Sequence, residues 1–165
     1  MIERFISRWR NEVGNDIYPA FRLILPDKDR DRPVYGLKEA VIAKLLIKLL
    51  RIDPKSDDGL LMTQWKSVAG GSRNTNAGDF AGRCGEVLSK RNERTEPGTM
   101  RIAEVNHLLD KLAGAQGERE QLPIFEEFYR RMNAEELKWL IRIIIKQMKV
   151  GATEKTFFTV RTSRC

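Results

Sequence analysis

The spacing of apolar residues constrains the fold of this chain more than any other feature. Apolar side chains recur at steps of three and four residues, as Ile2, Phe5, Ile6 and Trp9 do, whereas the alternating β-branched pattern of strands is almost absent. The sequence therefore predicts an all-α fold, a multi-helix bundle joined by polar loops. The expected helices cover about residues 2–13, 18–25, 34–52, 102–112, 125–132 and 134–148, and one more begins between residues 76 and 79 and ends at about residue 90. Loops are expected at 53–76 and 91–98.

Composition is that of a soluble single domain. The chain has 165 residues, 41% hydrophobic and 32% charged, which is too apolar for a disordered segment. Its uncharged apolar runs, such as residues 143–145, are far shorter than the roughly 20 residues of a membrane span. Two cysteines and one histidine cannot supply four ligands for a structural zinc ion. We therefore expect a reduced intracellular protein with no membrane segment, and with no metal or cofactor in this chain.

Basic residues gather near the C-terminal end. The net charge is +7, and residues 138–165 carry seven basic side chains against one acidic. At 100° per residue, the basic residues from 138 to 149 fall within an arc of about 80° on a helix that is otherwise apolar, with Trp139 and Ile143 in the core. Such rows suit a phosphate backbone, but they are also common on solvated helix faces. The two rows found are Lys138, Arg142, Lys146 and Lys149, and Lys44, Lys48 and Arg51.

Three short motifs fail on spacing. Residues 55–59 resemble the K-x-D-G sequence of nucleotidyl transfer, but the glycine comes one residue late. Residues 27–31 begin like a calcium loop, yet the glycine and the final glutamate of such a loop are missing. Residues 70–72 lack the G-K-[ST] ending of a phosphate-binding loop. His107 has no nucleophile or acid nearby in the sequence, so we assign no catalytic residue.

Five segments combine uncommon sequences with a fixed order. They are Tyr-Pro-Ala-Phe-Arg-Leu-Ile-Leu-Pro at 18–26, Tyr-Gly-Leu-Lys-Glu at 35–39, Ala-Gly-Asp-Phe-Ala at 77–81, Val-Asn-His-Leu-Leu-Asp at 105–110, and Lys-Trp-Leu-Ile-Arg-Ile-Ile-Ile-Lys at 138–146 with Lys-Val-Gly at 149–151. Together they resemble the N-terminal DNA-binding domain of eukaryotic ATP-dependent DNA ligases, and the first points to the branch of DNA ligase IV, the end-joining ligase. The resemblance implies a partial domain over residues 1–158 and an unmatched tail at 159–165. Because the family has one more helix before this region and catalytic domains after it, a truncated chain is expected.

The resemblance implies a function in holding DNA. The chain would grip nicked or broken duplex DNA without reading its sequence, during double-strand break repair and recombination by non-homologous end joining in the nucleus. The family uses ATP and Mg²⁺, but its K-x-D-G lysine is missing from this chain, which should be inactive alone. The turn before residue 80 would present helix N–H groups to a phosphate, or would serve only as a turn. The expected DNA-binding residues are Gly78, Asp79, Lys138, Arg142, Lys146, Lys149, Lys44 and Lys48.

Two other interpretations stay open at the level of sequence. The apolar face of Phe5, Ile6 and Trp9, uncovered if a preceding helix is missing, could dock a partner peptide, so the chain would be a helical interaction module. The chain could also be too incomplete to fold by itself. In addition, Arg101 stands where the family usually has a serine or threonine, so the following helix should borrow Thr99 as its cap or lack one.

Overall fold

The computed structural model describes residues 2–67 and 78–149. Within these ranges every regular element is helical, which confirms the all-α fold. The elements are α1 (Ile2–Glu12), α2 (Tyr18–Ile24), the 3-10 turn η1 (Pro26–Lys28), α3 (Glu39–Leu49), α4 (Asp57–Thr63), α5 (Phe80–Arg91), α6 (Ile102–Gly114), α7 (Glu118–Arg131) and α8 (Ala134–Ile144). The predicted tail at residues 159–165 and the boundary at 158 lie outside the described residues.

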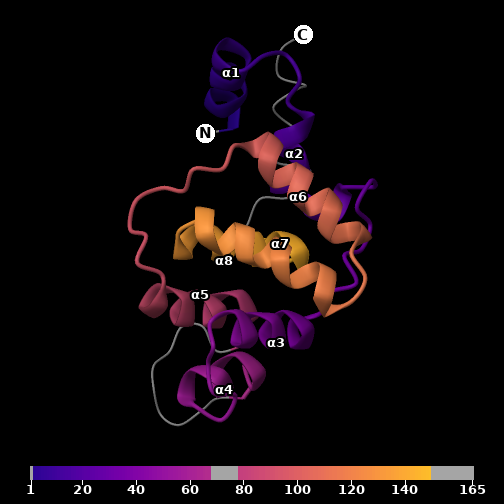
Figure 1. The fold of residues 1–165 in the computed structure, drawn as a ribbon. Coiled ribbons are helices and arrows are strands. Elements are labelled where there is room, and N and C mark those ends of the chain that lie inside the picture. Colours follow the sequence, from indigo (N-terminus) through magenta and orange to yellow (C-terminus); the bar gives the residue numbers. More distant parts are fainter. Residues whose placement is uncertain (1, 68–77, 150–165) are drawn as a thin grey trace.

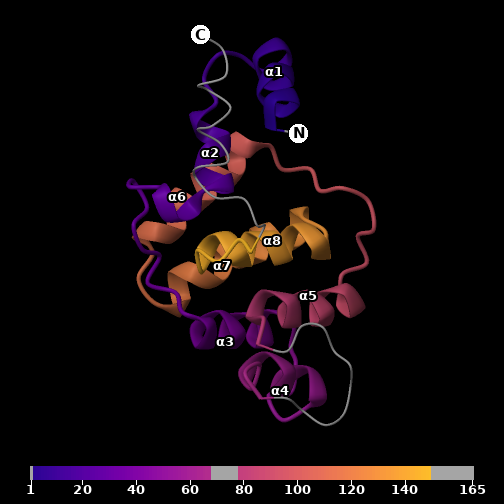
Figure 2. The ribbon, with the colours of Figure 1, turned by 180° about the vertical axis from the view of Figure 1, so that it is seen from behind.

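The helices form three tiers. α7 and α8 lie across the middle of the molecule, with α3 and α5 on one side and α2 and α6 on the other (Figure 1). The view from behind shows the same order, with α4 beyond α3 and α5, and α1 beyond α2 at the opposite end (Figure 2). α5 packs most extensively on α8 and α3 on α7, while α6 contacts both α2 and α7. The two central helices therefore hold the outer tiers together.

The core lies where the central tier meets α3 and α5. Ile42 and Ala43 of α3 are fully buried, as expected for a helix that is apolar almost all round. Phe80 of α5, Phe128 of α7 and Leu140 of α8 join the same buried cluster. Each large apolar side chain removed from water contributes roughly 1.5–3 kcal/mol. The core therefore joins residues from both halves of the chain.

The helix expected over residues 34–52 is shorter than predicted. α3 begins only at Glu39, because Gly36 takes φ +66° and Lys38 is extended, with φ −97° and ψ 168°. Tyr35 and Leu37 are nevertheless buried and belong to the core cluster. An irregular segment thus supplies apolar side chains with a spacing that resembles the start of a helix.

The loop expected at residues 53–76 contains a helix that the prediction missed. Ser56 is the N-cap of α4, and its hydroxyl accepts the backbone N–H of Gly59 at 3.3 Å. A Cβ atom on Gly59 would lie 2.5 Å from the backbone oxygen of Asp53, so the chain before α4 requires a glycine here. The Asp, Ser and Gly content that indicated a loop is therefore the start of a capped helix.

The last two helices also differ from their predicted bounds. α7 begins at Glu118 rather than near residue 125, and it contains Pro123, whose ring nitrogen cannot donate to the helical ladder. α8 ends at Ile144 instead of continuing to about residue 148. Lys146 and Lys149 follow it in the left-handed region, with φ of 56° and 51°. Side chains beyond Ile144 are therefore not in helical register with those of α8.

Two residues of the charged turn before α3, Asp29 and Arg32, belong to a buried polar network, while the other charged residues of the turn are exposed. Arg32, 1% exposed, donates from Nε to Asp29 at 2.8 Å and from Nη2 to the Oδ1 atom of Asn106 at 2.7 Å. Asn106 donates in turn to the backbone oxygen of Pro19 at 2.9 Å. Burial raises the pKa of Asp29, but hydrogen bonds and charge from Arg32 and Arg22 outweigh it and hold the pKa below its usual range. The network ties η1 and α2 to α6.

Membrane and metal features were also sought in the described residues. No helix there combines the length and the apolar character that a membrane span requires. The same residues hold no group of three or more His, Cys, Asp or Glu side chains placed to bind a metal ion.

Candidate nucleic-acid interface

The structure divides the predicted DNA-binding residues between two surfaces. Gly78, Asp79, Lys138, Arg142 and Lys149 gather where the start of α5 meets α8. Lys44 and Lys48 lie on α3 and face the start of α7, since both pair with Glu118. Lys146 belongs to neither group. These residues therefore do not form one continuous row.

Arg142 and Asp79 form a largely buried ion pair between α8 and α5. The guanidinium donates from Nη2 and Nη1 to the two carboxylate oxygens at 2.6 and 3.2 Å. Burial raises the pKa of Asp79, but the hydrogen bonds and charge of Arg142, with a further contribution from Lys149 at 3.8 Å, hold the pKa below its usual range. Asp79 is also the N-cap residue of α5. Arg142 thus serves the packing of two helices.

Lys146 points into the protein. Its ammonium donates to the backbone oxygens of Pro26 and Arg32, both at 2.7 Å, and lies 5.9 Å from the centre of the Tyr35 ring. Burial lowers the pKa of this ammonium, although the nearby charge of Asp29 opposes the shift. The predicted basic stripe is wrong at this position, because α8 ends before Lys146 and the left-handed backbone turns the side chain inward.

Lys138 remains at the surface, with its stem against a glycine. A Cβ atom on Gly85 would lie 3.1 Å from Cδ and 3.2 Å from Cγ of Lys138. Glu135, in the first turn of α8, binds the ammonium through both carboxylate oxygens, at 2.7 and 2.8 Å. Hydrogen bonds from Lys138 hold the pKa of Glu135 below its ordinary value. Asn133 fixes this turn, since its side chain accepts the N–H of Glu136 at 2.9 Å in a capping box.

Trp139 lies beside these charges rather than in the core, contrary to the prediction. Its side chain is half-buried, and its indole N–H donates to Glu135 at 3.0 Å. The ammonium of Lys138 and the guanidinium of Arg142 lie 5.4 and 5.3 Å from the ring centre. Ile143, by contrast, is buried as predicted.

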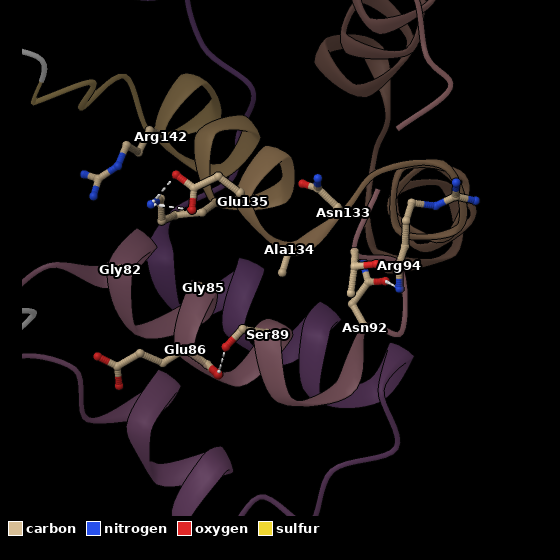
Figure 3. Close-up of a pocket in the computed structure, with 12 residues that line it drawn as sticks. Gly82, Gly85, Glu86, Ser89, Asn92, Arg94, Asn133, Ala134, Glu135 and Arg142 are labelled. Carbon is tan, nitrogen blue, oxygen red and sulfur yellow. Dashed lines mark hydrogen bonds and ion pairs between the residues drawn. The ribbon is translucent and has the colours of Figure 1, made fainter. Parts of the chain in front are cut away.

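An open groove of about 530 Å³ runs between α5 and α8. Arg142 and Arg94 lie toward its two ends, and Glu135 projects from α8 over Gly82 and Gly85 of α5 (Figure 3). The sequence prediction missed the glycines, although small residues three apart on one helix face indicate close approach of another element. It also missed the side chains from the loops, which have no sequence signal. The remaining lining residues are Glu86, Ser89, Asn92, Thr95, Asn133, Ala134 and Lys138.

The second surface, on α3, carries exposed cations that are partly neutralised. The Lys44 and Lys48 side chains are 76% and 59% exposed, and one carboxylate, Glu118, contacts both. Hydrogen bonds from Lys48 and Lys44 hold the pKa of Glu118 below its ordinary value. Arg51 follows α3 with a positive φ of 52° and is exposed. Neither the groove between α5 and α8 nor the smaller pocket lined by residues 63–67 includes these side chains.

Gly78 has the geometry of a turn. Its φ is +77°, and its N–H donates to the backbone oxygen of Trp65 at 3.4 Å. The glycine therefore sets the entry of the chain into α5. Its predicted contact with a phosphate stays a prediction.

The apolar face proposed for a partner peptide is largely covered. Trp9 is buried, and its indole N–H donates to the backbone oxygen of Asp16 at 2.9 Å. Phe5, 38% exposed, lies 6.0 Å from the Trp9 ring. Burial of Trp9 removes the main side chain that such a peptide would contact, so the structure lends no support to this docking face.

The helix that follows Arg101 has no side-chain cap from Arg101, which agrees with the second of the two expectations. Glu104 accepts the backbone N–H of Arg101 at 2.8 Å, and its other oxygen accepts from Arg131 at 2.8 Å. The N–H of Thr99 donates to the backbone oxygen of Arg131 at 3.0 Å. Glu104 therefore satisfies the N–H of the N-cap residue, which is the half of a capping box that does not need a serine or threonine.

Comparison with known proteins places this helical bundle with its basic groove in a family. The family model described as DNA ligase N terminus matches residues 1–161, so the chain belongs to the family of DNA ligase N-terminal domains. It is 65% identical over 161 residues to DNA ligase 4 of Neurospora crassa, covering 97% of this chain and 15% of that protein. DNA ligase 4 of Emericella nidulans is 63% identical, with 97% of this chain and 16% of that protein covered. DNA ligase 4 of Yarrowia lipolytica is 53% identical, with 94% and 16% covered. The chain thus spans about 15% of the length of the Neurospora relative.

Proposed function

We propose that this chain binds nicked or broken duplex DNA without sequence preference, as the N-terminal part of an ATP-dependent DNA ligase. The observation that carries the proposal is the match of the family model over residues 1–161. The similarity to proteins named DNA ligase 4 supports a function in double-strand break repair by non-homologous end joining. The nucleus is the proposed place of this function.

The groove between α5 and α8 is the proposed contact surface. Lys138 lines the groove and Lys149 lies beside Asp79 at the start of α5, with side chains 23% and 50% exposed. Phosphate contacts by lysine and arginine release condensed counterions and act on any sequence. A ligase must hold ends of any sequence, so this mode of binding suits the proposed role.

The covalent chemistry of the proposed ligase lies elsewhere in the enzyme. ATP and Mg²⁺ would serve a nucleotidyl-transfer lysine in a K-x-D-G motif, and the 165 residues contain no such motif. The residues of this chain would hold the duplex while other parts of the ligase act on its ends.

DNA binding by the purified chain tests the proposal. We expect fluorescence anisotropy to show similar affinities for nicked duplexes of unrelated sequence, and a steep loss of affinity with salt. Lys138→Gln and Lys149→Gln should each lower the slope of log affinity against log salt by about 0.9 if each contacts one phosphate. Lys111→Gln is the matched control, because this lysine is exposed on α6 and does not line the groove.

The design avoids Arg142 and Lys146, because both hold the fold and their loss would weaken binding indirectly. Lys44→Gln and Lys48→Gln form a second arm. If only these two variants lower the DNA affinity and its salt slope, the interface lies on α3 instead of the α5–α8 groove. Affinity that depends on sequence, or that does not fall with salt, would contradict the proposed function.

A further inference from the structure

The three cations that line the α5–α8 groove are held in different ways. Arg142 is buried against Asp79, and Nη2 of Arg94 donates to a backbone oxygen at 3.3 Å. The ammonium of Lys138 is instead held by the carboxylate of Glu135, whose side chain is 63% exposed. A pair at the surface is weak because water and salt screen it. Among these three cations, Lys138 is therefore the one whose acceptor is an exposed carboxylate, which another anion can replace.

The stem of Lys138 is already placed for such an exchange. Its methylene groups lie on Gly85, where a side chain on α5 would displace them. The stem is therefore positioned before any ligand arrives, and only the ammonium has to move. Ordering of a long side chain is one of the costs of binding, and this contact reduces it.

Glu135 keeps a partner when Lys138 leaves it. The indole N–H of Trp139 donates to its Oε1 atom at 3.0 Å. Carboxylate and phosphodiester oxygens are both anionic acceptors for an ammonium group. A phosphate can therefore replace Glu135 at Lys138 without leaving that carboxylate unpaired.

We propose that Glu135 sets the DNA affinity of the α5–α8 groove by competing with a backbone phosphate for the ammonium of Lys138. The inference rests on the proposed function and adds a regulator of affinity to it. Glu135 lowers affinity because its pair with Lys138 must open before that ammonium can contact a phosphate. A domain with such a carboxylate holds duplex DNA loosely enough to release it.

The test compares charge-neutral variants in the binding assay described above. Glu135→Gln keeps the size of the side chain and removes its charge, and it should tighten binding about two- to fivefold at low salt, as expected for one exposed charge pair. The salt slope should steepen by less than about 0.9, since Lys138 already replaces part of one counterion in the unchanged chain. Glu126→Gln, on the exposed face of α7 and outside the groove, is the control for net charge.

A double variant separates competition at Lys138 from a general charge effect. In the Lys138→Gln background, Glu135→Gln should give no more gain than Glu126→Gln. A gain that persists there would overturn the inference, as would equal affinities of Glu135→Gln and the unchanged chain. Glu135→Ala repeats the test and leaves no cavity, since the side chain is mostly exposed. Absence of DNA binding by the unchanged chain would overturn the proposed function, and the inference with it.

Discussion

The guanidinium of Arg142 faces the carboxylate of Asp79 across the α5–α8 interface, with Nη2–Oδ2 and Nη1–Oδ1 distances of 2.6 and 3.2 Å. Two parallel hydrogen bonds of this kind fix orientation as well as distance. The N-terminus of α5 is therefore held in a defined position against α8. Both residues were expected to contact DNA, and their geometry makes them parts of the scaffold that carries the groove.

Replacement of Arg142 should destabilise the fold. In Arg142→Met the Asp79 carboxylate keeps a backbone hydrogen bond from Gly82 and the distant Lys149 but loses its guanidinium partner, and a largely buried charge without its ion partner costs about 3 kcal/mol. Urea denaturation followed by circular dichroism measures the change in unfolding free energy. Addition of Asp79→Ala should recover part of the loss, because no orphaned carboxylate remains. Equal stability of Arg142→Met and the unchanged chain would show that the pair contributes nothing.

Acid should weaken the fold through the paired aspartates. The pKa values of Asp29, Asp58 and Asp79 lie below the ordinary range in the folded chain, because nearby arginine and lysine side chains outweigh any burial. Their contribution is complete above the ordinary aspartate pKa of about 3.9 and is lost as the pH falls through the lowered values. Unfolding free energy from urea titrations should therefore be level near neutral pH and fall below about pH 4. The fall should be shallower in Asp79→Asn.

Core packing of α8 should depend on Leu140 more than on Trp139. Leu140 is 2% exposed, and Leu140→Ala should cost about 2–5 kcal/mol because it leaves a cavity. Trp139 is half-buried beside charged groups, so Trp139→Ala should cost less. Thermal unfolding of the two variants under the same conditions compares their losses of stability. A larger loss at Trp139 would mean that its ring packs more tightly than its exposure indicates.

Lys55 should carry no nucleotide. The side chain is exposed just before α4, and its backbone N–H donates to Asp53 at 2.9 Å in a tight turn. A nucleophilic lysine needs a pocket that shields it from water and positions it against the nucleotide, and the exposed Lys55 side chain lies in none of the described pockets. Incubation with labelled ATP and Mg²⁺ should therefore give no covalent adenylate on denaturing gels. A labelled band that is lost in Lys55→Ala would show the opposite.

Sequence periodicity located most helices because each one buries a single apolar face. It failed where a turn glycine or a helix cap, rather than apolar spacing, determines the backbone conformation. Buried Tyr35 and Leu37 imitate a helical pattern, whereas Gly36 with φ +66° breaks it. The prediction missed α4 because its serine cap and its internal glycine are residue types that are also common in loops.

The candidate site was only partly predictable, because charge patterns along a sequence do not show which acid each base meets. The Asp79 carboxylate lies 63 residues from Arg142 in the chain, and the carbonyls that hold Lys146 lie 114 and 120 residues away. Such pairings follow from tertiary packing alone. Lys138 and Glu135 are three residues apart on one helix, so their pairing could have been foreseen.

The buried network around Arg32 has a consequence for how the domain opens. Its hydrogen bonds join Arg32 to Asn106, 74 residues away, and Asn106 to Pro19, 87 residues away. Opening of α2 or η1 from α6 would strand a buried guanidinium, so neither segment can detach by itself at low cost. We therefore expect the amide hydrogens of α2 and α6 to exchange with solvent as one cooperative unit, although the two helices are separated by half the chain.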